Sequence, residues 1–157
     1  MVLLFSLCAP ARDTQQTRQL ARAQFDTAEE MREALNRKPE AQRTRHDYQR
    51  TIDAYRRVYF LSPSVSKADA SVFAAAELMT EQGRAFKDEK ALRSAVAQYE
   101  FLRHDYPGSK YRFDALIAIG QICKDDLNDR EQAKQAFEEF LRRYPRQQRA
   151  AEARSAL

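Results

Sequence analysis

Hydrophobic residues recur along most of this chain at spacings of three and four, which is the period of one buried face of an α-helix. The pattern predicts seven helices, over residues 13–36, 39–61, 66–83, 88–106, 109–123, 129–145 and 147–157. No stretch alternates apolar and polar residues in the way that predicts a strand. Because only 3 glycines and 5 prolines interrupt the chain, we expect an all-α fold.

The predicted helices carry one apolar stripe each, and several have residues that mark their ends. In the first helix the stripe is expected to include Leu20, Phe25, Ala28, Met31 and Leu35. Pro39 suits the first turn of the second helix, and Gly83 suits the C-terminus of the third. N-caps are expected at Ser66 (in a capping box with Asp69), Asp88, Ser109 and Asp129.

Three stretches share a small residue, an aromatic residue four positions later and a proline eight positions after that. They are Thr51, Tyr55 and Pro63; Ala95, Tyr99 and Pro107; and Ala133, Phe137 and Pro145. The prolines lie 44 and 38 residues apart, and a recurrence of this length predicts stacked supersecondary units. One helix pair cannot bury its stripe alone, so neighbouring pairs must stack. Small residues such as Ala95, Ala133 and Gly120 permit the close approach of helices.

The order of alanine, aromatic residue and proline resembles the second helix of a tetratricopeptide repeat. The first helix departs from the common repeat, since Ile119 and Gly120 follow Pro107 about three residues later than the usual Leu-Gly pair. In this respect the chain is similar to repeats of bacterial envelope proteins, namely the outer-membrane β-barrel assembly lipoprotein and the periplasmic coordinator of cell division. The stretch 97–116 also resembles the repeat region that precedes the catalytic domain of some N-acetylmuramoyl-L-alanine amidases.

This resemblance covers about residues 13–157 and implies a specific architecture and function. The helix pairs would stack as a short right-handed solenoid of three hairpins and a partial seventh helix. A peptide or protein partner of the envelope would then bind in a groove lined by the first helix of each pair. The predicted groove residues are Lys67, Tyr111, Arg112 and Asp114.

The same resemblance leaves other functions open. The chain fits a non-catalytic interaction scaffold, but also the targeting module of a cell-wall amidase whose catalytic domain is not in this chain. A lipoprotein subunit that acts in outer-membrane assembly is a further alternative, and a cytosolic repeat adaptor is the remaining one. The chain stops one residue before the position where the repeat pattern expects a small residue in the seventh helix. This favours the interpretation that the chain is the leading part of a longer protein.

The N-terminal residues 1–11, MVLLFSLCAPA, are interpreted as a partial signal sequence, and residues 12–157 as one helical repeat domain. Ala9-Pro10-Ala11 has the form of a signal cleavage site, which predicts a periplasmic or outer-membrane-associated protein. Two alternatives are a lipidated Cys8 and an ordinary N-terminus. The apolar stretch is shorter than the roughly 20 residues that a membrane-spanning helix needs, so no span is expected.

No catalytic or metal-binding constellation is evident in the sequence. His46 and His104 lie on charged faces, and the chain has no H-E-x-x-H motif. Cys123 falls on an inward stripe, so we interpret it as a small core residue rather than a nucleophile. The acidic segment 124–129 lacks the glycine and terminal glutamate of a calcium loop. We therefore expect no cofactor and no bound metal.

Charge is the last feature of the sequence that limits the range of possible functions. The chain has 27 basic and 23 acidic residues, a net charge of +4, which is too mild to indicate nucleic acid. Arginines cluster on residues 43–57 and 142–149. Solvated helix faces are the favoured interpretation, and an acidic partner peptide or an anionic envelope polymer such as peptidoglycan stays open. No nucleic-acid partner is expected.

Overall fold

The computed structural model describes residues 14–157; the predicted signal sequence and Cys8 lie outside this range. Within it the chain forms seven α-helices, a 3₁₀ turn (η1) and a π-helical turn (η2), and no strand. The elements are α1 (Gln15–Arg37), η1 (Glu40–Gln42), α2 (Arg45–Leu61), α3 (Ala68–Phe86), α4 (Glu89–Asp105), α5 (Arg112–Gln121), η2 (Ile122–Asp126), α6 (Arg130–Arg143) and α7 (Ala150–Ala156). The predicted all-α class is therefore confirmed for the described residues.

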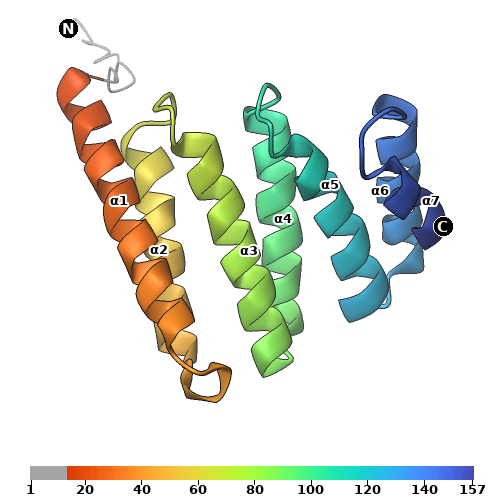
Figure 1. Ribbon diagram of the computed structural model, residues 1–157, viewed down its shortest axis with the longest axis horizontal. Helices are drawn as coiled ribbons and strands as arrows, with labels where there is room; N and C mark the ends of the chain where they lie inside the picture. The colour runs from red at the N-terminus through yellow and green to blue at the C-terminus, as the bar shows by residue number, and fades with distance from the viewer. Residues whose placement is uncertain (1–13) are drawn as a thin grey trace, which may run out of the picture.

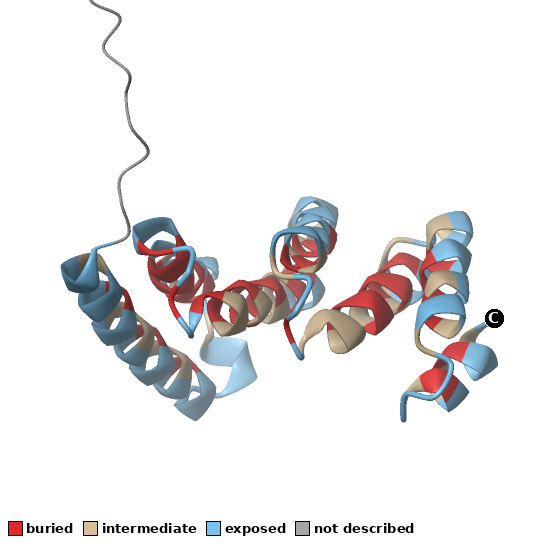
Figure 2. Cartoon of the chain, turned by 90° about the horizontal axis from the view of Figure 1, so that it is seen from above, coloured by how far each residue is buried: buried red, intermediate tan, exposed pale blue. Residues whose placement is uncertain are grey.

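The helices lie side by side in chain order and alternate in direction, so that α1 and α7 stand at opposite ends (Figure 1). Each helix packs chiefly on the helices before and after it. Seen from above, the odd-numbered helices form one layer and α2, α4 and α6 form the other (Figure 2). Buried residues gather between the two layers, while the outward faces are exposed. The predicted helix pairs are confirmed by this arrangement.

The three proline-containing turns are built in the same way. In each turn the residue before the proline donates its amide to a carbonyl four residues back: Ser62 to Val58, Tyr106 to Leu102, and Tyr144 to Phe140. Two further bonds follow in each turn, in which a backbone amide donates to the carbonyl three residues before it. In the Pro63 turn the donors are Val65 and Ala68, in the Pro107 turn they are Ser109 and Arg112, and in the Pro145 turn they are Gln147 and Ala150. The sequence copies therefore have equivalent backbone structure where one helix pair passes into the next.

The aromatic residues of the copies are buried at the centre of the helix pairs. Tyr55 and Tyr99 each meet a phenylalanine of the preceding odd helix edge to face, with centroids 6.0 Å from Phe25 and 5.6 Å from Phe73. Ala95 and Ala133 are buried as well. In the third pair Phe137 packs on Gly120, where an added β-carbon would lie 2.6 Å from the ring. Gly120 thus allows the close helix approach that the sequence predicted.

The stripe of α1 differs from the prediction at one residue. Leu20 is 52% exposed, and the buried residues are Ala21, Ala28 and Leu35, seven positions apart. The difference arises because α1 stands at the end of the array and packs chiefly on α2. A single neighbour covers a stripe that is narrower than the one a central helix buries.

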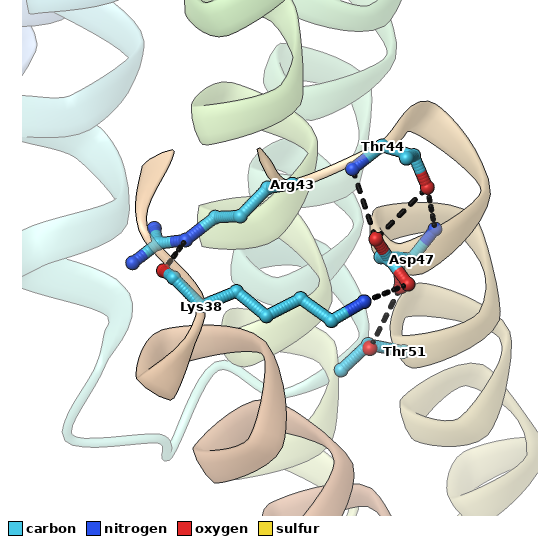
Figure 3. A network of polar contacts seen from close by, with 5 residues as sticks. All are labelled: Lys38, Arg43, Thr44, Asp47 and Thr51. Atoms are coloured by element: carbon cyan, nitrogen blue, oxygen red, sulfur yellow. Dashed lines mark hydrogen bonds and ion pairs between the residues drawn. The ribbon is translucent and has the colours of Figure 1, made fainter. Parts of the chain in front are cut away.

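Helix α2 begins later than the prediction from Pro39. Its N-cap is Thr44, which forms a capping box with Asp47: the Thr44 hydroxyl accepts from the Asp47 amide at 3.1 Å, and the Asp47 carboxylate accepts from the Thr44 amide at 2.9 Å. Lys38 donates to the same carboxylate at 2.7 Å (Figure 3). These bonds, that of Lys38 first, hold the pKa of Asp47 far below its ordinary value. The Pro39 segment forms η1 instead.

Two end signals of α3 are wrong. Lys67, not Ser66, precedes the helix, and its side chain makes no cap bond. Asp69 accepts the hydroxyl of Ser109 at 2.7 Å, which ties α3 to the turn before α5. Gly83 lies inside the helix, which runs to Phe86. Its function is to make room for Leu92, since a β-carbon there would lie 2.6 Å from the Leu92 side chain.

The expected N-caps of α4 and α6 are confirmed, because Asp88 accepts from the Ala91 amide and Asp129 from the Gln132 amide. The fifth helix has Tyr111 as its N-cap; Ser109 accepts the Tyr111 amide instead. The acidic segment after α5 continues the helix as η2 and then turns at Asn128, which has a φ of 52°. The shorter proline spacing of the third unit reflects shorter helices, since α6 has 14 residues where α4 has 17, and α5 has 10 where α3 has 19.

Candidate functional site

An open cleft of about 280 Å³ lies on the layer formed by the odd helices. Its walls come from α3, α5 and Arg149, the residue before α7, and Tyr99 of α4 and Ile122 of η2 also line it. We call this cleft the odd-helix groove, and it is lined by Phe73, Glu77, Thr80, Glu81, Arg84, Tyr99, Asp114, Ala118, Gln121, Ile122 and Arg149.

Ion pairs join each odd helix to the next along this face. Arg32 of α1 contacts Glu77 of α3 at 2.9 Å. Arg84 of α3 donates both Nε and Nη2 to the carboxylate of Asp126 in η2, at 3.0 and 2.8 Å. Each pair bridges neighbouring units, so the ion pairs fix the spacing of the helices that border the groove.

The third bridge is a small network at the C-terminal end. Arg149, the residue before α7, donates to Asp114 of α5 at 2.8 Å and to both carboxylate oxygens of Glu152. Gln121 donates to Glu152 as well. The bond from Arg149 lowers the pKa of Glu152, although burial opposes the shift.

The carboxylates of α3 are the least compensated charges in the groove. Glu81 is 3.9 Å from Arg32, which is already paired with Glu77 at the shorter distance. Burial raises the pKa of Glu81, and repulsion from Glu77 raises it further, while Arg32 acts in the opposite direction. Among the residues that line the groove, three carry carboxylates (Glu77, Glu81 and Asp114) and two carry guanidinium groups (Arg84 and Arg149). The charge balance of the groove therefore favours a ligand with basic groups.

The predicted groove residues occupy different places around this site. Asp114 lines the groove. Tyr111 stacks on the groove residue Phe73, with centroids 4.8 Å apart and an interplanar angle of 19°. Lys67 lies at the N-terminal end of α3 with its ammonium 5.0 Å above the ring of Phe25. Arg112 lies over Phe113 and donates to the carbonyl of Ser109, so neither Lys67 nor Arg112 lines the groove.

Apart from Asp114, the polar residues by which α3 and α5 line the groove were not predicted from the sequence. Glu77, Glu81 and Arg84 follow Phe73 at spacings of four, four and three, and Asp114, Ala118 and Gln121 repeat at four and three. These positions flank the apolar stripe of each odd helix. The spacing was visible in the sequence, but which flank faces the groove depends on how the helix pairs stack.

The histidines and the cysteine stand apart from the groove. His46 and His104 are exposed, and Cys123 is fully buried. Burial raises the pKa of the Cys123 thiol to about 11, so the thiol is protonated at neutral pH. Between residues 14 and 157 no three His, Cys, Asp or Glu side chains are grouped so that they could hold a metal ion.

No protein-family model matches this chain, and neither a curated protein nor a solved structure matches it. Among the described helices, none combines the length and the apolar character needed to cross a membrane.

Proposed function

We propose that this protein is an interaction scaffold of the bacterial cell envelope, built as a right-handed tetratricopeptide-like solenoid, that holds a peptide segment of a partner protein in the odd-helix groove. The observation that carries the proposal is the groove itself. It runs between the successive odd helices α3 and α5 as far as Arg149 before α7, and its walls combine aromatic rings with carboxylates that are not fully paired. Stacked helix pairs use such a face to bind extended or helical peptides.

The equivalence of the three proline turns supports the solenoid assignment. Identical backbone bonds at Pro63, Pro107 and Pro145 repeat the same change of direction between units, and a repeated operation of this kind generates a superhelical array. The envelope assignment is supported by the signal-like residues 1–11 and by the resemblance of the repeats to envelope proteins.

The charge of the groove narrows the partner to a segment with lysine or arginine side chains. A basic side chain near Glu77 and Glu81 would compensate carboxylates that share Arg32. The rings of Phe73 and Tyr99 offer apolar and cation–π contacts beside them. Tyr111 supports this wall through its stacking on Phe73.

Site-specific photocrosslinking tests the proposal. A photoreactive phenylalanine analogue replaces either Ala118, which lines the groove without carrying charge, or Gln135, which is exposed on α6, and each protein is irradiated with envelope extract of the source bacterium. The proposal expects a discrete crosslinked partner from position 118 that a Tyr111→Ala/Arg112→Ala variant weakens. Identical crosslinks from both positions, or none from position 118, would count against the groove.

A further inference from the structure

The opposite face of the molecule carries a second groove, between α2 and α4, with α3 as its floor. It has a volume of about 580 Å³ and includes Arg56, Tyr59 and Phe60 of α2, Met79 of α3, and Gln98 and Phe101 of α4. We call it the even-helix groove. It lies on the other side of α3 from the odd-helix groove, because Met79 lines one and Thr80 and Glu81 line the other.

Three aromatic rings form a row across this groove, and the two outer rings are exposed. Tyr59 packs between Phe60 and Phe101, with centroid distances of 4.8 and 5.7 Å. Phe60 is 67% exposed and Phe101 is 37% exposed, although Tyr59 beneath them is buried. Large exposed rings gathered on one face of a protein are a common mark of an interaction site.

Arg56 contributes a cation that the described residues leave uncompensated. Its guanidinium lies 5.6 Å from the centroid of the Phe60 ring, and its buried Nε makes no hydrogen bond. A buried donor without an acceptor is costly, and a carboxylate is the group that a guanidinium fork binds best. The groove therefore presents a charged donor directly beside exposed aromatic surface.

Basic groups outnumber unpaired acidic groups along this groove. Besides Arg56 it is lined by Lys90 of α4, which is exposed and forms no ion pair within residues 14–157. The nearby acid Asp88 is already paired with Arg45. Asp53 accepts from Gln49 and is the remaining carboxylate of this part of α2. This face thus attracts an acidic partner, whereas the odd-helix groove attracts a basic one.

We infer that the even-helix groove is a second docking site, which binds an acidic amphipathic peptide whose carboxylate pairs with Arg56 and whose apolar side chains cover Phe60 and Phe101. The aromatic row distinguishes this occupant from a purely anionic polymer, because a polymer without apolar groups would leave the exposed rings in water. With one groove on each layer, the protein would connect a basic segment and an acidic segment of its partners.

Selection from a library of displayed random peptides of about 15 residues, or about four helical turns, tests this inference. The immobilised wild-type protein selects the peptides. The library is first passed over the immobilised Arg56→Gln variant, which retains the peptides that bind outside the even-helix groove. The enriched sequences are expected to combine Asp or Glu with large apolar residues. Enrichment of basic sequences, or no enrichment over an unrelated helical protein, would overturn the proposal.

Fluorescence anisotropy with the most enriched peptide then locates the site. Arg56→Gln and Phe60→Ser should each weaken binding about tenfold, as loss of a charge-assisted bond or an aromatic anchor does. Arg146→Gln is the matched control, since it removes one exposed arginine from a distant turn. Phe60→Ser keeps the test valid if Arg56→Gln perturbs folding, because Phe60 is mostly exposed.

Three further outcomes separate this site from its alternatives. Poly-L-glutamate that binds as tightly as the peptide would overturn the requirement for apolar contacts. A wild-type dimer in sedimentation that Arg56→Gln dissociates would show that a second copy covers the face, and would overturn the peptide as occupant. Loss of peptide binding in the Tyr111→Ala/Arg112→Ala variant, with Arg56→Gln unaffected, would place the peptide in the odd-helix groove instead.

Discussion

Replacing Gly120 with alanine places a methyl group where the ring of Phe137 already lies. The added carbon would be 2.6 Å from both Cε1 and Cζ of that ring, whereas carbon atoms in contact are about 3.5–4.0 Å apart. Phe137 is fully buried, and because protein interiors are closely packed, its ring can move only by displacing its neighbours. The substitution therefore tests whether α5 and α6 pack as closely as the repeat pattern requires.

The expected loss of stability follows from two opposing effects. An alanine inside a helix is favoured over glycine by about 1 kcal/mol, while overpacking a core costs about 1–3 kcal/mol. A displacement of about 1 Å of a buried ring belongs to the upper part of that range. We expect a net loss of about 1–2 kcal/mol, which lowers the Tm by about 2–8 °C for a chain of this length.

Urea and thermal denaturation followed by circular dichroism measure this change. Gly108→Ala is the matched control, because a β-carbon at Gly108 meets nothing within 4 Å and its φ is not positive. That variant should keep its stability or gain up to about 1 kcal/mol from the reduced entropy of the unfolded chain. If Gly120→Ala stabilised the protein as Gly108→Ala does, the close contact between α5 and α6 would be refuted.

A double-mutant cycle with Phe137→Leu assigns the cost to this contact. Leucine removes the ring atoms nearest to Gly120, so Gly120→Ala should cost less in the Phe137→Leu background, with a coupling energy of about 0.5–3 kcal/mol. Additive effects would indicate that the methyl group acts elsewhere in α5.

Three further predictions concern the helix start, a groove carboxylate and the buried thiol. Thr44→Ala should lower the free energy of unfolding in urea by about 1 kcal/mol, and Thr44→Ser should retain most of it, because Thr44 caps α2; equal stability of the two variants would contradict the cap. Burial, with repulsion from Glu77, raises the pKa of Glu81 above its ordinary 4.5. The protonated form is therefore favoured in the folded state, so the contribution of Glu81 to the free energy of unfolding is complete below pH 4.5 and is lost as the pH rises through the raised pKa. Urea midpoints between about pH 4 and 8 should show a smaller fall for Glu81→Gln, by less than about 1 kcal/mol since Glu81 is partly exposed; an unchanged pH profile would count against the shift. In a Cys8→Ser variant, the native Cys123 thiol, with a pKa of about 11, should react with an aromatic disulfide reagent at least about 100-fold more slowly than in urea, and comparable rates would show that it is accessible.

The helices and the repeat units could be predicted from the sequence because they depend on local signals. The periodic stripes and the proline turns are short-range features, and Asp88 and Asp129 cap their helices as expected. The prediction from Gly83 was wrong because glycine is common both at helix ends and where helices pack closely. Only the position of Leu92 in the structure shows that Gly83 serves close packing. Ser66 failed as a cap because Asp69 bonds to Ser109 of the following turn.

The grooves could not be predicted with the same success, since they depend on residues that are far apart in the sequence. Arg84 and Asp126, for example, are paired across two units, and no local pattern links them. The charged residues Arg56 and Glu81 resemble ordinary solvated positions until the neighbouring helices are placed. The stacking of the units, rather than the composition of any one helix, divides the surface into a basic face and an acidic groove.

The central claim is that the three proline-punctuated stretches are equivalent units, each closed by an aromatic residue packed on the odd helix before it. A nuclear Overhauser spectrum of the full chain tests it most directly. We predict cross-peaks between the rings of Phe25 and Tyr55 and of Phe73 and Tyr99, and between the α-protons of Gly120 and the ring of Phe137. Cross-peaks that placed Tyr55, Tyr99 and Phe137 against unrelated helices would contradict the repeat architecture and both grooves that depend on it.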